Sequence, residues 1–193
     1  MAGDGRVIGP AVGVMERALL KVPPLGRLYM APYKRVVKKE IELAQLTPGK
    51  KVLQIGAGSL PFSAIHLARL AGVFVCAIDI DQRAVKRARR WIRNLNLEAQ
   101  IEVEHGDGKD FPPTGFSAAF VALQAEPKAE IIKHLMAASP PGFKVVVRQP
   151  REQFRSQYSA VPSSWPKRGE VRQAMITFSA SLLFVSQGQG HGR

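Results

Sequence analysis

The stretch KVLQIGAGSLPFSAIHLARL, from Lys51 to Leu70, joins a short apolar run, a Gly-x-Gly turn and a helical pattern that begins after a proline. A short continuous apolar run is typical of a strand that is buried on both faces. Gly56 and Gly58 leave the turn free of side chains, so a flat ligand can lie against bare backbone. The stretch therefore predicts a strand, a ligand-binding turn and a helix.

Strand and helix patterns alternate along the residues that follow. Strands are predicted over residues 50–56, 73–79, 100–106, 117–123 and 143–149, and helices over residues 61–72, 81–97 and 127–139. This alternation predicts a mostly parallel sheet with helices on both faces, a three-layer α/β/α, Rossmann-like fold. Ligands of such sheets bind beyond the carboxyl ends of the strands.

Two segments flank this core. Residues 1–49 are predicted to form an N-terminal arm that ends in a capping helix, YKRVVKKEIELAQL. Residues 50–186 form the ligand-binding domain, and its last stretch, AMITFSASLLFVS, alternates like an antiparallel edge strand. Residues 187–193 are expected to be a disordered tail. No internal repeat and no second domain is indicated.

The composition favours a soluble protein with one domain. The chain has 193 residues, of which 46 % are hydrophobic and 22 % charged, which are ordinary values for a globular protein. No apolar run is long enough to span a membrane, and the first residues lack a basic leader with a long apolar run. Cys76 is the only cysteine and falls in a predicted strand, so we expect a buried, inert thiol and a cytoplasmic protein. No spacing of cysteine, histidine and aspartate residues in the sequence indicates a metal site.

The formal net charge of +13 is unusual for this composition. A surface of this charge attracts nucleic acid or small polyanions. Cations that simply cover solvated helix faces explain the charge equally well. The basic residues gather in three groups, Lys34, Arg35, Lys38 and Lys39, then Arg83, Lys86, Arg87, Arg89, Arg90 and Arg93, and finally Arg148, Arg151, Arg155, Lys167, Arg168 and Arg172.

The residues around the glycine turn indicate which ligand it binds. Asp79 ends the second strand, about twenty residues after the turn, where a carboxylate can accept both hydrogens of a ribose diol. Dinucleotide enzymes have a third glycine whose surroundings present amides to a pyrophosphate, and Pro61 stands there instead, without an amide hydrogen. A ligand with a ribose and no pyrophosphate fits best, and S-adenosylmethionine meets that description. The alternative for Asp79 is an acid at a helix start, although Asp81 suits that capping role better.

A second turn supports the same ligand. Asp107 and Gly108 follow the third strand, and the carboxylate of Asp107 is expected to reach an adenine amino group. The alternative is an ordinary turn aspartate. Ala57, Ile80 and Leu123 adjoin these positions and are predicted to line the cofactor site with them.

Four stretches of the chain resemble a known protein family. They are PYKRVVKKEIE, GAGSLPFSAIHLA, AIDIDQRAVKRARR and FVALQAEPKAEIIKHLMAASPPGFKVVVRQP. The core from Lys50 to Gln149 resembles class I S-adenosylmethionine-dependent methyltransferases, and within them the nicotianamine synthases and their bacterial and archaeal relatives. The resemblance covers roughly residues 25–161. It implies transfer of the 3-amino-3-carboxypropyl group to an amine with release of methylthioadenosine, whereas methyl transfer would release S-adenosylhomocysteine.

Candidate catalytic residues lie on the helix before the first strand. Tyr33 and Glu40 are two helical turns apart, so they share a face with Val37, Ile41 and Ala44. A glutamate on an apolar face is costly unless it is paired or functional. We predict that this helix caps the cofactor, with Tyr33 over the ligand and Glu40 directed toward it. The alternative is that Glu40 pairs with a lysine and Tyr33 belongs to the core.

The acceptor is expected at the ends of the fourth and fifth strands. Gln124 and Glu126 follow the fourth strand, and Arg148 near the end of the fifth is placed to hold an acceptor carboxylate or to form a structural salt bridge. Three function classes remain open: a transferase that moves a methyl or an aminocarboxypropyl group to a small molecule, an RNA-modifying transferase favoured by the charge, and a binding module without activity. A homodimer is also compatible with the sequence.

Overall fold

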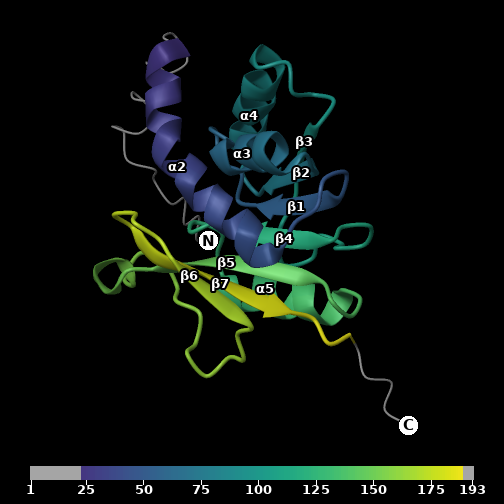
Figure 1. Cartoon of the computed structure of the whole chain (residues 1–193), viewed down its shortest axis with the longest axis vertical. Coiled ribbons are helices and arrows are strands. Elements are labelled where there is room, and N and C mark those ends of the chain that lie inside the picture. The colour runs from purple at the N-terminus through teal and green to yellow at the C-terminus, as the bar shows by residue number, and fades with distance from the viewer. Residues whose placement is uncertain (1–22, 189–193) are drawn as a thin grey trace, which may run out of the picture.

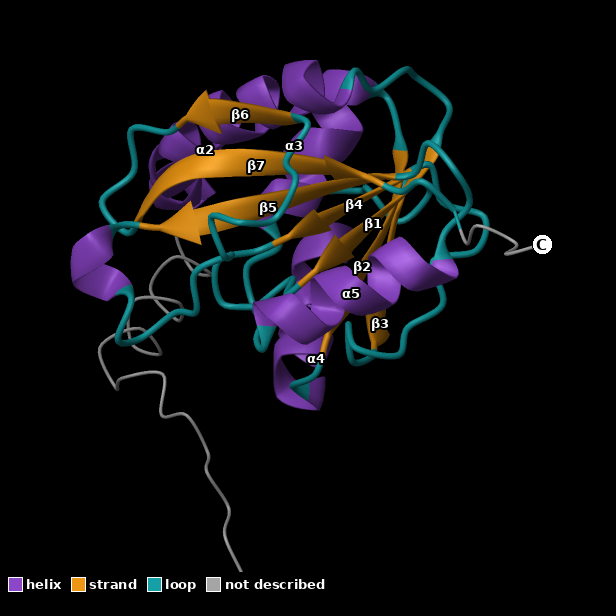
Figure 2. Cartoon of the chain, turned by 90° about the horizontal axis from the view of Figure 1, so that it is seen from below, coloured by secondary structure: helices purple, strands orange, loops and turns teal. Residues whose placement is uncertain are grey.

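A computed structural model of the chain describes residues 23–188, with side chains described from Pro32 onward. Residues 1–22 of the predicted N-terminal arm and the last five residues of the predicted tail lie outside this described part. Within it, seven strands form one sheet in the order β3-β2-β1-β4-β5-β7-β6 (Figure 2). The strands are β1 (Lys51–Ile55), β2 (Phe74–Asp79), β3 (Ile101–His105), β4 (Ala118–Val121), β5 (Lys144–Pro150), β6 (Gly169–Arg172) and β7 (Phe178–Val185).

The first five strands are parallel. A helix connects each consecutive pair of them except β3 and β4, which are joined by a loop. β7 pairs antiparallel with β5, and β6 pairs antiparallel with β7. The sheet is therefore mixed, with an antiparallel pair at one end. Four of its strands, β1, β2, β4 and β5, are almost wholly buried, which explains their continuous apolar runs.

The prediction of an edge strand over residues 174–186 needs correction. β7 lies between β5 and β6, and the edge position belongs to β6. The run from Leu182 to Phe184 is buried, which fits a strand that is covered on both faces. β6 is only four residues long and alternates between half-buried and exposed, as a short edge strand does.

The helices divide between the two faces of the sheet. They are α2 (Pro23–Ala44), α3 (Phe62–Ala71), α4 (Gln82–Asn94) and α5 (Lys128–Ala138), and a short 3₁₀ helix spans Glu152–Phe154. Figure 1 shows α2 running beside α3 and across the part of the sheet that holds β5 and β7. Figure 2 shows α5 on the opposite side of the sheet from α2 and α3. The capping helix predicted over residues 33–46 is the C-terminal half of α2.

Strand alternation decides which side chains meet which helices. On β1, Val52 belongs to the core cluster under α2, α3 and α4, whereas Leu53 belongs to the cluster under α5. The same alternation continues on β2, β4 and β5, so successive residues serve opposite faces. Val147 packs toward α5, and Arg148 next to it therefore projects toward α2 and α3.

The local signals at the helix ends are as predicted. Asp81 is the N-cap of α4, and its side chain accepts a hydrogen bond from the Arg83 N–H at 2.8 Å. α3 ends at Gly72, whose φ of 62° is in the left-handed region. Of the helices in residues 23–188, none has the length and apolarity that a bilayer crossing requires.

Candidate functional site

The glycine turn lies at the carboxyl ends of β1 and β4. The N–H groups of Gly56 and Ala57 both donate to the Ile78 carbonyl oxygen at 2.9 Å, which bends the chain away from β1. Gly56 has a φ of +79°, and a Cβ there would lie 3.2 Å from the Cβ atoms of Ala122 and Ala125. Both the backbone conformation and the packing therefore require glycine at this position.

Asp79 is held directly against this turn. Its Oδ2 accepts a hydrogen bond from the Gly58 N–H at 2.7 Å, and its Oδ1 accepts one from the Asp81 N–H at 2.9 Å. A Cβ on Gly58 would meet nothing within 4 Å, so the turn is open beside this carboxylate. The half-buried Asp79 is thus fixed next to bare backbone, and its lone pairs have room for further donors.

The start of α3 offers little to a phosphate. Pro61 is the N-cap and has no N–H, and the Phe62 N–H donates to the Leu60 carbonyl oxygen at 2.8 Å. No side chain caps this helix start. A helix N-terminus that binds a pyrophosphate presents free amides, and here these two positions present none.

The second turn contributes Asp107 and Gly108. Asp107 Oδ1 accepts from the Lys109 N–H at 3.0 Å, and Oδ2 lies 3.4 Å from Lys109 Nζ, so the turn aspartate also stabilises its own loop. A Cβ on Gly108 would lie 2.6 Å from Ile55 Cγ2, so only glycine lets the turn approach β1 this closely. Ile80, beside Asp79, exposes 66 % of its surface and offers an apolar contact at the same edge.

At the rim of β4 the predicted acceptor residues differ in their surroundings. Leu123 is buried and Gln124 is exposed. Glu126 is half-buried, and its carboxylate accepts hydrogen bonds from Lys128 Nζ and from the N–H and hydroxyl of Ser159. Burial alone would raise the pKa of Glu126, but the hydrogen bonds from Lys128 and Ser159 outweigh it and lower the pKa.

Lys128 is a residue that sequence reasoning missed. Its side chain is fully buried, and Nζ donates to the Leu123 carbonyl oxygen as well as to Glu126. Nζ also lies 5.9 Å from the centre of the Tyr158 ring. Lysines rarely occupy such positions, and nothing in the local pattern marks this one as buried. The group joins the β4 rim to the loop that follows β5.

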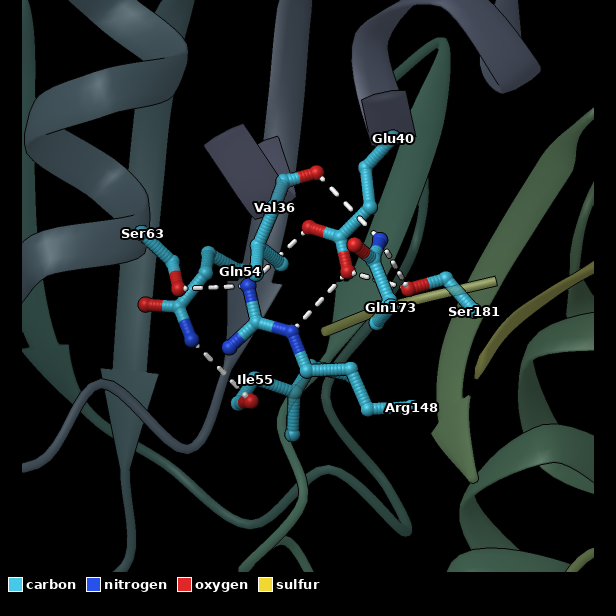
Figure 3. Close-up of polar contacts among 8 residues, drawn as sticks. All are labelled: Val36, Glu40, Gln54, Ile55, Ser63, Arg148, Gln173 and Ser181. Atoms are coloured by element: carbon cyan, nitrogen blue, oxygen red, sulfur yellow. Dashed lines mark hydrogen bonds and ion pairs between the residues drawn. The ribbon is translucent and has the colours of Figure 1, made fainter. Parts of the chain in front are cut away.

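Arg148 and Glu40 form a buried ion pair under α2 (Figure 3). Arg148 Nε lies 2.9 Å from Glu40 Oε1 and Nη2 lies 3.0 Å from Oε2, which is a bidentate arrangement. Both residues expose 5 % of their surface or less. Burial alone would lower the pKa of Arg148, but the adjacent carboxylate outweighs it and raises the pKa above its ordinary value.

Three further side chains, from α3, β7 and the turn after β6, complete this network. Arg148 Nη2 donates to Ser63 Oγ at 2.8 Å, and Ser181 Oγ donates to Glu40 Oε1 at 2.7 Å. Gln173 Nε2 donates to Ser181 Oγ at 3.0 Å and to the Val36 carbonyl oxygen at 3.4 Å. The network therefore ties α2 to α3, β5, β7 and the turn after β6 (Figure 3).

Tyr33 contacts both this network and the start of α3. Its ring centre is 5.7 Å from Arg148 Cζ and also 5.7 Å from the centre of the Phe62 ring, at the start of α3. Tyr33 is half-buried, so part of its ring stays accessible. Gln54 lies beside the network, and its buried Oε1 has no hydrogen-bond partner among residues 23–188.

The fold thus brings the predicted cofactor residues to one edge of the sheet. Gly56 to Gly58, Asp79 and the turn at Asp107 meet at the carboxyl ends of β1, β2 and β3, and Leu123 and Gln124 follow β4. Glu40 and Arg148 pair with each other, so the cation opposite Glu40 is an arginine and not a lysine. In the described part of the chain, no group of His, Cys, Asp and Glu side chains could hold a metal ion.

Comparisons with known proteins identify the family and the fold of the chain. The model of the family described as "Nicotianamine synthase protein" matches residues 24–161. A curated relative, L-histidine 2-aminobutanoyltransferase from Yersinia pestis, is 35 % identical over 74 residues, which is 38 % of this chain and 28 % of that protein. The chain therefore matches less than a third of that relative's length.

Solved structures share the fold. MtNAS in complex with MTA and tNA superposes with a TM-score of 0.76 at 21 % identity, over 89 % of this chain and 68 % of that one. An RNA methyltransferase from Salinibacter ruber in complex with S-adenosyl-L-homocysteine gives a TM-score of 0.65 at 18 % identity, over 82 % and 94 %. The predicted Rossmann-like methyltransferase fold is confirmed.

Proposed function

The chain belongs to the nicotianamine synthase family, and on that premise we propose that it transfers the 3-amino-3-carboxypropyl group of S-adenosylmethionine to a nitrogen of a small molecule. The acceptor nitrogen attacks the aminocarboxypropyl carbon that is bonded to the sulfonium sulfur. The bond between this carbon and the sulfur breaks, and its electron pair stays on sulfur. Methylthioadenosine leaves, and the acceptor nitrogen loses a proton. The name of the Yersinia pestis relative, which joins L-histidine and a 2-aminobutanoyl group, supports an amino acid as the acceptor.

In this proposal residues 50–186 form the cofactor-binding domain and α2 caps it. Asp79 accepts the ribose hydroxyls, since its carboxylate already lies 2.7 Å from the Gly58 N–H beside open space. This contact is the observation that carries the proposal, because it supports a site in which one ligand meets both the Asp79 carboxylate and the bare backbone turn. The adenine side is lined by Asp107, Gly108, Ile80 and Leu123. Pro61 lies beside the turn and has no N–H, so it cannot donate a hydrogen bond to a phosphate.

The acceptor side uses the capping helix. Tyr33 covers the reacting group, and its hydroxyl is available to an amine that must lose a proton. Glu40 acts through Arg148 as a positioning residue, because its carboxylate is already shared between Arg148 and Ser181. Gln124, which is exposed at the β4 rim, contacts the acceptor, and Glu126 holds the loop at Ser159 in place beside it. The sulfonium is already activated, so the protein mainly aligns the two reactants.

Product analysis tests the proposal directly. The protein is incubated with S-adenosylmethionine and L-histidine, or with a pool of amino acids, and the nucleoside product is identified by mass spectrometry. Methylthioadenosine is the expected product, together with an acceptor whose mass has increased by one aminocarboxypropyl group. S-adenosylhomocysteine as the product would show methyl transfer instead. If neither nucleoside forms and calorimetry detects no binding of S-adenosylmethionine, the assignment as an enzyme is overturned.

An RNA acceptor is the second candidate, and the net charge of +13 is the observation that favours it. RNA recovered from the same incubation would then carry the transferred group, and the amino acids would not. The fully buried Cys76, free of any disulfide, supports a cytoplasmic location. A homodimer remains part of the proposal and is measured by light scattering.

A further inference from the structure

Helix α4 carries an unusually one-sided charge. Its thirteen residues, QRAVKRARRWIRN, contain six cations and no acidic residue. All six cations are exposed, whereas the apolar residues of the helix are buried against the sheet. The cations are Arg83, Lys86, Arg87, Arg89, Arg90 and Arg93.

Three of these cations are engaged by neighbouring residues. Arg87 donates to Ser59 Oγ, Arg89 to the Val103 carbonyl oxygen, and Arg93 to Glu98. The other three, Arg83, Lys86 and Arg90, have no side-chain hydrogen bond or ion pair among residues 23–188. They are spaced three and four residues apart, so they form one stripe along the outer face of the helix.

The neighbouring helices extend this positive surface. Lys34, Arg35 and Lys38 on α2 and Arg69 on α3 are exposed and likewise make no ion pair within the described residues. α2, α3 and α4 cover the same face of the sheet, and on the described parts of these helices and their caps the exposed acids are Glu42 and Asp81. The cations therefore exceed the acids on this face several-fold, and the ion pair of Arg93 with Glu98 balances only one of them.

We propose that the stripe on α4, flanked by the cations of α2 and α3, binds the phosphodiester backbone of a nucleic acid strand. From Arg83 to Arg93 the helix rises about 15 Å, enough to meet several phosphates of one strand. Arginine predominates, and its planar group matches phosphate oxygens in pairs. An anionic membrane is the less suitable partner. Trp91 and Ile92, the large apolar residues of α4, are buried, so the helix exposes no large apolar side chain for insertion into a bilayer.

The salt dependence of binding tests this proposal. Fluorescence anisotropy measures the affinity of the full chain for a labelled single-stranded RNA at several salt concentrations. The triple variant Arg83→Gln, Lys86→Gln, Arg90→Gln removes three phosphate contacts, so the slope of log K against log salt is expected to become shallower by about 2. Arg87 is left unchanged because it contacts Ser59 in the loop after the glycine turn.

A matched variant controls for net charge. Lys133→Gln, Arg155→Gln, Arg168→Gln removes the same number of exposed cations from outside helices α2, α3 and α4, and it is expected to keep the parent slope. Double-stranded DNA measured in parallel distinguishes RNA from DNA as the source of the phosphates. Equal slopes in the two triple variants, absence of RNA binding, or binding only to anionic vesicles would each overturn the proposal.

This outcome is independent of the proposed reaction. Calorimetry with S-adenosylmethionine is expected to give the same affinity for the α4 variant as for the parent, because within residues 23–188 no hydrogen bond or ion pair joins the three changed side chains to the glycine turn. A loss of cofactor affinity in that variant would show that the substitutions had disturbed α4 itself. A changed salt slope would then no longer indicate phosphate contacts, and the nucleic-acid proposal would be overturned.

Discussion

The buried pair of Glu40 and Arg148 makes a quantitative prediction about stability. In Glu40→Gln the shape of the side chain stays, but the Arg148 guanidinium keeps its charge with no counter-charge beside it. Removing one partner from a buried ion pair typically costs 3–5 kcal/mol, and the bidentate contacts at 2.9 and 3.0 Å with 1 % exposure of Glu40 place this pair in that class. We therefore expect Glu40→Gln to lower the free energy of unfolding by about 3–5 kcal/mol.

The assay is urea unfolding followed by circular dichroism, with the slope against denaturant compared between variants. Two controls sharpen the result. Glu152→Gln removes the acid of an exposed pair with Arg155, which is 3.0 Å long, and should cost less than about 1 kcal/mol. The double variant Glu40→Met, Arg148→Met removes both charges and fills the space with apolar atoms, so it should recover most of the stability lost by Glu40→Gln.

Two results would refute this reasoning. A cost below about 1 kcal/mol for Glu40→Gln would mean that the pair is solvated as a surface pair is. A double variant as unstable as the single one would mean that Ser63 and Ser181, which lose their charged partners in it, carry the stability. A recovered double variant that binds S-adenosylmethionine but forms less product would separate the positioning role of the network from its structural one.

Three further predictions concern single residues. Asp79→Ala should weaken binding of S-adenosylmethionine by at least about 1 kcal/mol in calorimetry, through lost hydrogen bonds, while the capping control Asp81→Ala should lower stability and leave the affinity unchanged. Burial, with the Glu104 carboxylate nearby, raises the pKa of Cys76 to about 12, so the native thiol should resist a disulfide reagent at pH 8 and react fully in urea; rapid native labelling would contradict this. The pKa of Glu126 is lowered in the folded state, so its contribution to stability is present above its ordinary pKa of 4.5 and is lost as the pH falls through the folded value. Glu126→Gln should therefore flatten the acid limb of the stability profile, and an unchanged limb would assign that limb to other carboxylates.

Much of the proposed cofactor site could be predicted from local patterns. Apolar runs identify β1, before the glycine turn, and β2, which Asp79 ends, whereas alternation identifies β3, before the turn at Asp107. Parallel strands end at one edge of the sheet, so these three features were expected to lie together. The buried face of α2 was predicted in the same way, because helical spacing groups Val37 and Ala44 with Glu40, and all three are buried.

Other features depend on which strands become neighbours. The partner of Glu40 lies 108 residues away on β5, and it faces α2 because β5 stands beside β7 and alternation turns Arg148 toward the helix layer. Periodicity within β7 does not reveal that β6 covers its outer side, so its edge position was predicted wrongly. The burial of Lys128 could not be predicted for a similar reason. It depends on the loop at Tyr158 and Ser159, which lies against Lys128 and Glu126.

Local side-chain spacing was enough to predict the order of strands and helices along the chain, the glycine turn that we propose as a ligand site, and the Asp79 carboxylate beside it. These follow from side-chain spacing over a few residues, where chain geometry leaves few choices. The tertiary structure alone decided that Glu40 and Arg148 neutralise each other, that Lys128 is buried with Glu126, and that the cations of α2, α3 and α4 share one face. Such pairings depend on distances between segments that are remote in the chain, and burial makes charges that meet there strongly coupled.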